Sequence, residues 1–210
     1  MREVTRDLIA RHGGEVLTKG EIISLVRTLR PAREVKNPEN YVKYLSSGAK
    51  YLIRIFRGLY YVKDVEEVFY RTVKDIHRVV AAGLERKGLN WYYGLFTAME
   101  LGGYTHVHRP VIYVINDRVH RRIRVAGVPV RFVKVRPSLI FGFAGEPRIS
   151  DPEKTVLDFL YLERYGTIPA QSVRAALDEI TSYVKLDRVK LREYARRYPN
   201  FVVRKLDILG

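Results

Sequence analysis

Three carboxylates stand close together in the segment SDPEKTVLDFLYL, at Asp151, Glu153 and Asp158. Such a group can serve as general acid and base or hold a magnesium ion, as in enzymes that process nucleic acids. The segment is also a typical helix start, because Asp151 precedes Pro152 and acidic residues suit the first helical turn. Capping leaves only Asp158 unexplained, and a carboxylate buried in this apolar helix needs a partner such as an arginine. We expect structural pairing at Asp158, with metal-dependent catalysis as the alternative.

Two histidines, His106 and His108, are spaced so that on a strand they share one face. A zinc site needs three or four ligands, and no third ligand stands at a recognisable spacing. The chain has no cysteine, which excludes disulfides, thiolate metal sites and cysteine nucleophiles. No serine lies in a nucleophile elbow, and GFAGEP lacks the lysine and the Ser/Thr of a phosphate-binding loop. We therefore expect no metal, no cofactor and no enzymatic activity.

Polar side chains suited to DNA recur in the first quarter of the chain. Four of them are spaced at i, i+4, i+7 and i+11, which places them on one side of a helix. Tyr41, Val42 and Leu45 lie on the opposite side and can face a core. The four polar residues are Lys36, Asn40, Lys43 and Ser47. Lysine binds phosphates, while asparagine and serine reach base edges. The pattern indicates a DNA-reading face, and the alternative is an ordinary solvated face.

The segment YLIRIFRGLYYV, residues 51–62, has the alternation of a β-hairpin with Arg57 and Gly58 at its turn. Gly58 supplies the positive φ that a tight turn needs. The residues expected to anchor the hairpin on the helices are Ile53, Ile55, Leu59 and Tyr61. Three cations of this region, Lys50, Arg54 and Arg57, are the DNA contacts that we expect from it.

Helices that precede the hairpin must position these residues. The apolar spacing predicts helices over residues 2–11, 18–29 and 37–47. Three helices followed by a basic hairpin is the order of a winged helix-turn-helix, whose last helix enters the major groove while the hairpin contacts the adjacent backbone. We expect this DNA-binding domain over residues 1–63.

Local signals mark the starts of the second and third helices. Thr18 and Glu21 form the pattern of a capping box. Asn37 can cap the third helix, and Pro38 then occupies its first position. The connection between the two helices, RPAREVKN, is basic and extended.

Residues 64–210 are expected to form a second domain. A single long helix over 64–87 begins it and links the domains, because apolar residues keep a 3.6-residue period there. Further helices are predicted over 90–101, 151–165, 169–180 and 187–197, and strands over 110–116, 121–127, 128–135, 138–143 and 201–209. The chain is therefore expected to be α+β, an N-terminal winged helix-turn-helix followed by a mixed α+β domain.

A second basic group lies on the predicted strands. Its members are Arg118, Arg121, Arg122, Arg124, Arg131 and Lys134. On alternating strands some of these side chains line one face, which suits a second nucleic-acid surface or a landing site for an acidic partner. The alternative is that they are solvated outer residues of a two-sided sheet.

The charge of the whole chain favours a polyanionic partner. The 210 residues carry a formal net charge of +15 and a pI near 10.0. Residues 1–63 contribute +7 of this and residues 64–210 contribute +8. The single glutamine, Gln171, suits a thermophile, but heat adaptation explains abundant charges of both signs better than an excess of one. No apolar run is long enough for a membrane span and no secretion signal is evident, so we expect a cytoplasmic protein without a membrane partner.

Several segments, in order along the chain, resemble the AbiEi-type antitoxins. YLIRIFRGLYYV resembles the end of that family's winged helix, with its Arg-Gly-x-Tyr turn. WYYGLFTAMELGG is similar to its helix with an Ala-x-Glu-Leu core. VIYVINDRVHRRIRVAGVPVRFVKV resembles its strand region, and ISDPEKTVLDFLYL resembles its Pro-Glu-Lys/Arg-x-x-x-Asp helix. The resemblance spans roughly residues 18–165.

The resemblance implies a transcriptional regulator that is the antitoxin of a toxin–antitoxin pair, with a nucleotidyltransferase as the toxin. The winged helix of such proteins binds operator repeats in double-stranded DNA and represses the pair's own promoter. Their second domain counters the toxin without requiring a stable complex. On this chain, the DNA contacts would lie on 36–47 and at Arg54 and Arg57, and the antitoxic surface within 64–210, with the arginine-rich strands as part of it.

Two other function classes stay open. One is a nucleic-acid-processing enzyme that uses magnesium at Asp151, Glu153 or Asp158. The other is a non-catalytic RNA-binding or protein-bridging module. Metal-dependent activity that disappears in Asp158→Asn would support the first, and preference for structured RNA over duplex DNA would support the second.

Overall fold

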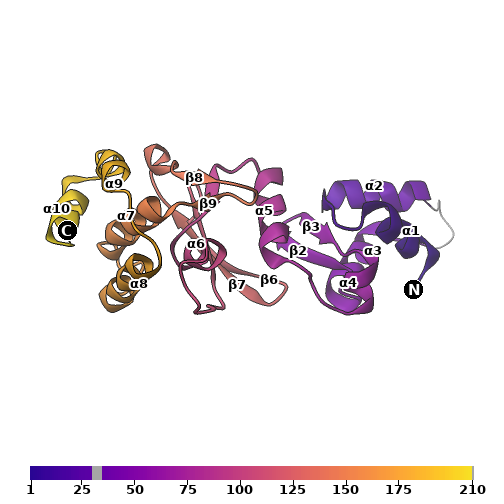
Figure 1. The fold of residues 1–210 in the computed structure, drawn as a ribbon. Coiled ribbons are helices and arrows are strands. Elements are labelled where there is room, and N and C mark those ends of the chain that lie inside the picture. Colours follow the sequence, from indigo (N-terminus) through magenta and orange to yellow (C-terminus); the bar gives the residue numbers. More distant parts are fainter. Residues whose placement is uncertain (30–34, 210) are drawn as a thin grey trace. The chain divides into compact units, whose positions relative to one another are not determined.

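Helices and strands alternate along residues 1–29 and 35–209, the part of the chain that the computed structural model describes (Figure 1). This mixture confirms the α+β class. The contacts divide the chain into two compact units. The first comprises Met1–Gly88 and Arg124–Val128, and the second comprises Leu89–Ile123 and Pro129–Gly210. Most of the basic connection expected between the second and third helices, residues 30–34, lies outside the described residues.

The first unit contains helices and a small sheet in the predicted order. Its elements to the end of the hairpin are α1 (Glu3–His12), β1 (Val16–Thr18), α2 (Lys19–Leu29), α3 (Pro38–Lys43), a π-helical turn (Tyr44–Gly48), β2 (Leu52–Phe56) and β3 (Leu59–Val62). The strands form an antiparallel sheet of order β1-β3-β2. The short strand β1 has no counterpart in the sequence prediction, because three residues are too few to show a period.

The core of the first unit lies between its helices and one face of this sheet. It includes Val4, Leu8, Ile22, Val26, Tyr41, Val42, Leu45, Leu52 and Val62. Of the expected hairpin anchors, Ile55, Leu59 and Tyr61 are buried, whereas Ile53 is only half-buried. A β-bulge between Arg54 and Phe56 interrupts the alternation, so consecutive residues of β2 are buried at its end.

The single helix expected over 64–87 is wrong, because two helices occupy this region. α4 (Val65–Phe69) has a capping box in which the Asp64 side chain accepts from the Glu67 N–H. α5 (Ile76–Arg86) starts anew at Asp75, whose side chain accepts from the Arg78 N–H at 3.0 Å. The continuous apolar period hid this second cap.

The helix α5 packs on the hairpin and belongs to the first unit. A Cβ added to Gly83 would lie 2.7 Å from Cγ2 of Ile55, so glycine permits the close approach of helix and strand. The first unit therefore continues to Gly88, beyond the boundary that the sequence indicated after residue 63.

The second unit is a mixed sheet covered by helices. Its elements are β4 (Trp91–Tyr93), α6 (Leu95–Leu101), β5 (Ile112–Asn116), β6 (Arg121–Val125), β7 (Val128–Lys134), a 3-10 turn (Pro137–Leu139), β8 (Phe143–Ala144), β9 (Ile149–Ser150), α7 (Pro152–Glu163), α8 (Ala170–Tyr183), α9 (Arg188–Ala195) and α10 (Asn200–Leu209). The end of β6, the turn and the start of β7, residues Arg124–Val128, are the part of these strands that is grouped with the first unit. The strand order is β6-β7-β5-β4-β9-β8. Strands β5 and β7 pair in parallel, as do β4 and β9, whereas β4 and β5 are antiparallel.

Three sequence predictions in this unit need correction. The run 201–209 is the helix α10 and not a strand, because Val202 packs into the helical core despite the β propensity of its neighbours. The helix expected over 90–101 starts only at Leu95, after the strand β4. The strand expected over 138–143 is largely a 3-10 turn and irregular chain.

The helix α7 is the centre of the second unit. Its residues from Glu153 to Leu162 are all buried, and it contacts α6, α8, α9 and α10 (Figure 1). No helix within the described ranges combines the length and apolar character needed to cross a membrane.

Candidate nucleic-acid interface

The helix α3 is fixed by its cap and by its apolar side. The Asn37 side chain accepts from the Asn40 backbone N–H at 3.0 Å, and Pro38 follows the cap, as predicted. On the inner side, the Tyr41 hydroxyl hydrogen-bonds the Thr5 hydroxyl of α1. The Arg2 guanidinium lies 5.4 Å from the centre of the Tyr41 ring. These contacts hold α3 against α1 and leave its other side to solvent.

The predicted capping box at the start of α2 is present. The Thr18 backbone N–H donates to Oε2 of Glu21 at 2.7 Å, and the Glu21 N–H donates to Oγ1 of Thr18 at 3.2 Å. The Thr18 N–H and an ion pair with Arg86 hold the pKa of Glu21 below its usual value. The pair with Arg86 also ties the start of α2 to the end of α5.

The polar face predicted around α3 is exposed, while Tyr41, Val42 and Leu45 are buried on the opposite side. The exposed members are Lys36, Asn40, Lys43 and Ser47. Their side chains make no ion pair or hydrogen bond with other described residues. Four polar side chains are thus open to a ligand, but the single helical face expected for them is wrong. Only Asn40 and Lys43 lie on α3, whereas Lys36 precedes the Asn37 cap and Ser47 lies in the π-helical turn.

A π-helical turn changes the geometry at the end of this face. The Ala49 N–H donates to the Tyr44 carbonyl, five residues earlier, at 2.9 Å. A π turn is wider than an α turn, so Ser47 does not keep the regular spacing that relates Asn40 to Lys43. Tyr44 is 55% exposed beside Lys43, and the sequence prediction did not include it. Turns of this kind are frequent at functional sites.

The hairpin turn consists of Arg57 and Gly58, since Phe56 pairs with Leu59. Gly58 has φ +74°, which a glycine adopts without strain. Arg57 is exposed at the turn, and Arg54 is exposed on β2 opposite Tyr60. Neither arginine pairs with an acid in the described part of the chain.

Lys50, the remaining predicted contact, is exposed and has φ +56° between the π turn and β2. The structure adds Lys19, whose Nζ donates to Oε2 of Glu39 at 3.1 Å and so joins α2 to α3. Apart from its charge, nothing in the sequence distinguishes Lys19 from other surface lysines. The position of Lys19 beside α3 depends on packing between two helices that are separate in the chain.

The second basic group does not form one surface. The Arg121 guanidinium lies 5.9 Å from the ring centre of Phe132. The Arg131 guanidinium lies 5.9 Å from the ring centre of Tyr113. Arg131 and Phe132 are neighbours on β7, so their side chains leave opposite faces of the sheet. Of the group, Arg118, Arg121, Arg122, Arg124 and Lys134 are exposed. These cations are therefore distributed over both faces.

Asp158 is paired, as expected, but the partner is a lysine on its own helix. Lys154 and Asp158 are both fully buried, and Nζ lies 2.5 Å from Oδ1. The Lys154 Nζ also donates to the hydroxyls of Tyr92 and Tyr198, at 2.7 and 2.5 Å. Both hydroxyls in turn donate to Asp158, at 2.8 and 2.7 Å. Burial and the Asp158 charge raise the pKa of each tyrosine, while burial lowers that of Lys154.

The other two carboxylates connect α7 to α9. Asp151 caps α7 by accepting from the Lys154 N–H at 2.8 Å. Glu153 accepts from the Asp187 N–H at 2.8 Å. Lys190 bridges the two acids, with Nζ at 3.1 Å from Asp151 and 2.9 Å from Glu153. All three carboxylates of the segment are thus bound by protein donors.

The two histidines are held by separate contacts. His106 packs edge-on against Tyr183, with ring centres 5.0 Å apart, and His108 Nδ1 contacts a carboxylate oxygen of Glu100. Among the described residues, no three His, Asp or Glu side chains gather into a group that could hold a metal ion.

Comparison with known proteins gives a likeness of fold to a solved structure. No protein-family model matches the chain, and no curated protein matches it. Among solved structures, the chain is similar to the crystal structure of RV2827C protein from Mycobacterium tuberculosis, with a TM-score of 0.62 and 13% identity. The alignment covers 95% of this chain and 72% of that chain. At this identity, the likeness shows a shared fold alone.

Proposed function

We propose that the first unit is a winged helix-turn-helix that binds double-stranded DNA, and that the chain is a transcriptional repressor. The observation that supports this most directly is the exposure of Asn40 and Lys43 on α3, and of Lys36 just before its cap, while the cap and the core hold the helix in place. In this proposal α3 enters the major groove, and the β2–β3 hairpin follows the adjacent strand backbone.

The residue types around α3 suit two different kinds of DNA contact, to phosphates and to base edges. Lys36 and Lys43 have no acidic partner within the described residues, so phosphate binding would not first require an internal ion pair to break. Asn40 carries the amide that can pair with the edge of an adenine. Lysines would therefore set the position on the duplex, and Asn40 would contribute sequence preference.

The hairpin contributes the second contact. Arg54, Arg57 and Lys50 are exposed, and a guanidinium can hold a phosphate through two parallel hydrogen bonds. The net charge of +15 adds long-range attraction to a polyanion.

The wider biological role in this proposal rests on the AbiEi resemblance. The chain would bind operator repeats of its own promoter and act as the antitoxin of a nucleotidyltransferase toxin in the cytoplasm. Its second unit would counter the toxin without a stable complex. This part is tested separately, by looking beside this gene for a nucleotidyltransferase-like reading frame and measuring growth when that frame is expressed with and without the full chain. Growth arrest that the full chain does not relieve would contradict the antitoxin role.

The DNA-binding part is tested by titrating the full chain with duplex DNA from upstream of its own gene, with a scrambled duplex and a structured RNA of equal length. We expect the upstream duplex to bind most tightly and its affinity to fall steeply with salt, because each phosphate contact releases counterions. Equal affinity for all three, or preference for the RNA, would contradict the proposal.

A further inference from the structure

Lys63 is a buried cation without a partner. It follows β3 directly, and only 6% of its surface is exposed. Its side chain makes no hydrogen bond or ion pair with any described residue. Burial lowers its pKa, an effect that Glu67 opposes and Lys50 reinforces. The enclosed side-chain nitrogen and oxygen atoms that lack a hydrogen-bond partner among the described residues belong to Arg109 and Asp117. The Lys63 ammonium is therefore not sealed from solvent and can meet an anion in the pocket that it lines.

The nearby carboxylate of Glu67 acts on Lys63 through its charge alone, because other donors hold both of its oxygens. Oε2 of Glu67 accepts from the Tyr61 hydroxyl at 2.7 Å and from the Asp64 N–H at 3.1 Å. Oε1 accepts from the Lys74 N–H at 2.9 Å. With both oxygens engaged, Glu67 stabilises the start of α4 and the chain before α5.

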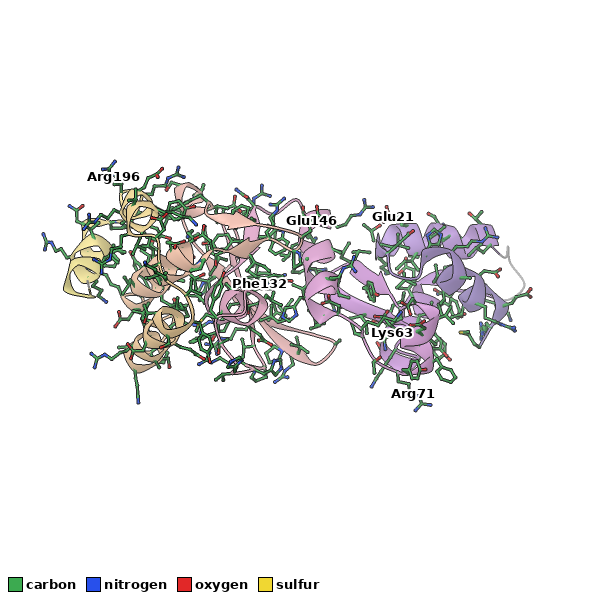
Figure 2. The ribbon with its side chains drawn as sticks, in the orientation of Figure 1. Glu21, Lys63, Arg71, Phe132, Glu146 and Arg196 are labelled. Carbon is green, nitrogen blue, oxygen red and sulfur yellow. The ribbon has the colours of Figure 1, made fainter. Side chains whose placement is uncertain are left out.

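Lys63 lines a pocket of about 620 Å³ in the first unit, together with Lys50 and Arg71. The same three cations also line a second depression, of about 650 Å³. Both volumes fall in the range of small-molecule sites. Figure 2 shows Lys63 within the first unit and Arg71 extending from its surface. Three cations thus converge from three separate parts of the chain.

The backbone holds two of these cations in an unusual conformation. Lys50 has φ +56° and Arg71 has φ +57°, in the left-handed region that non-glycine residues seldom adopt. Such strain tends to occur at binding sites, where the surrounding structure maintains it. Here it places one cation before β2 and the other after α4, with Lys63 between them in sequence.

An aromatic wall completes the pocket. Phe69 lines it and is 78% exposed, and its ring meets that of Tyr70 at right angles with centres 5.0 Å apart. Tyr70 is itself 68% exposed. The two neighbouring rings present aromatic faces to solvent beside the cations, and a nucleobase can stack on such a face.

We propose that this pocket binds a nucleotide, with Lys50, Lys63 and Arg71 on its phosphate and Phe69 against its base. The phosphate can come from a free mononucleotide or from a strand of DNA bound to the first unit. The free-nucleotide interpretation does not depend on the DNA-binding proposal, because Lys50 alone among the proposed DNA contacts lines the 620 Å³ pocket.

The test uses the full chain and its Lys63→Met variant, with AMP and inorganic phosphate as free probes and the upstream duplex as the third. Methionine fills the same buried space without a charge, so the variant should fold. We expect AMP to bind the wild type and to shift the amide resonances of residues 48–51 and 69–71. Binding should weaken at least about tenfold in Lys63→Met, the effect of losing one charge-assisted contact. Arg71→Ala, at an exposed position, should weaken it as well. Lys87→Met should leave it unchanged, because this exposed lysine of the first unit lies outside the pocket and outside the proposed DNA contacts.

The probes distinguish the source of the phosphate. Loss of AMP binding in both pocket variants with unchanged duplex affinity assigns the pocket to a free nucleotide. No AMP binding, with a duplex affinity that falls about tenfold in both variants, assigns it to a nucleotide of DNA. If AMP, phosphate and the duplex each bind the two variants with the same affinity as the wild type, the pocket proposal is wrong. This holds even if the duplex itself binds.

Discussion

The backbone N–H of Lys19, the first residue of α2, donates to the carbonyl of Gly58 in the hairpin turn, at 2.8 Å. Thr18, one residue earlier, pairs with Leu59 at the other side of the turn. The Lys19 side chain then reaches Glu39 on α3. One short chain of contacts therefore joins the hairpin turn, the start of α2 and α3. The position of Arg57 relative to Lys43 is set by this connection and not by the hairpin alone.

Gly58→Ala should lower the free energy of unfolding by about 1–2 kcal/mol, because alanine is strained at φ +74°. A Cβ there would meet no atom within 4 Å, so the cost comes from the backbone and not from a clash. Urea unfolding followed by circular dichroism measures it. Gly20→Ala is the matched control, since this glycine lies in the first turn of α2 and alanine favours a helix by up to about 1 kcal/mol. Equal destabilisation by both substitutions would refute the account of the turn.

Arg57→Ala should weaken binding to the upstream duplex and to a scrambled duplex by the same factor. The side chain stands at the hairpin turn, where we expect it to meet phosphate and to carry no sequence information. The slope of log K against log salt should also decrease by about one. A loss confined to the upstream duplex would mean that Arg57 reads a base edge instead.

Asn40→Ala should reduce the preference for the upstream duplex over the scrambled one, by about 1–3 kcal/mol if its amide reads a base. Lys36→Ala, on the same face, should weaken both duplexes alike. The backbone N–H of Asn40, which the Asn37 cap uses, is retained in the alanine variant. Binding curves for both duplexes separate these effects, and an unchanged preference in Asn40→Ala would remove this residue from base recognition.

Lys154→Met should destabilise the second unit by about 3–5 kcal/mol, because it leaves the buried charge of Asp158 uncompensated. Trp91, the single tryptophan, is buried in this unit, so its fluorescence reports the unfolding in urea. The double variant Lys154→Met/Asp158→Asn keeps an acceptor for Tyr92 and Tyr198 without the charge. It should recover part of the loss, and a double variant as unstable as the single one would contradict the pairing account.

The pH dependence of stability should differ between the wild type and Lys63→Met. Folding lowers the pKa of Lys63 below 10.5, the value of a lysine in the unfolded chain. At any pH between the folded and the unfolded pKa, the unfolded chain therefore binds more protons at this residue. The stability of the wild type relative to the variant must therefore increase as pH rises through that interval. Glu67 and Lys50 are the charged groups that act on Lys63 and are common to both proteins. Parallel stability curves from pH 7 to 10.5 would show that the burial has no such effect.

Local signals made part of this structure predictable. The capping box of Thr18 and Glu21 and the cap at Asn37 involve residues within four positions of one another, so sequence alone specifies them. The exposure of Asn40 and Lys43 on α3 followed from the local helical period, whereas the early end of α3 and the π-helical turn that follows it did not. The cap at Asp75 was equally local, but a continuous apolar period over 64–87 concealed the break before it.

Contacts between distant residues could not be predicted in this way. Burial of Lys63 depends on α4 and the hairpin meeting in space, and a sequence shows only an exposed-type residue after a strand. The partner of Asp158 was four residues away, yet its two tyrosine ligands are more than 35 residues from it. The helix α10 forms because Val202 packs into the core, a tertiary effect that outweighs the strand propensity of its residues.

The most direct test of the DNA-binding claim is the affinity of Lys43→Glu for the upstream duplex at low salt, compared with the wild type and Lys87→Glu. Lys87 is an exposed lysine at the end of α5. It serves as the control because it lies on a different element from Lys43. The helix α5 packs on the hairpin through Ile55, whereas α3 packs with the core that includes Leu52 and Val62. Both variants change the net charge equally. We predict that Lys43→Glu loses at least about tenfold in affinity beyond the loss in Lys87→Glu, while both unfold at the wild-type urea concentration. Equal affinities for the two variants would show that α3 is not the surface that meets DNA.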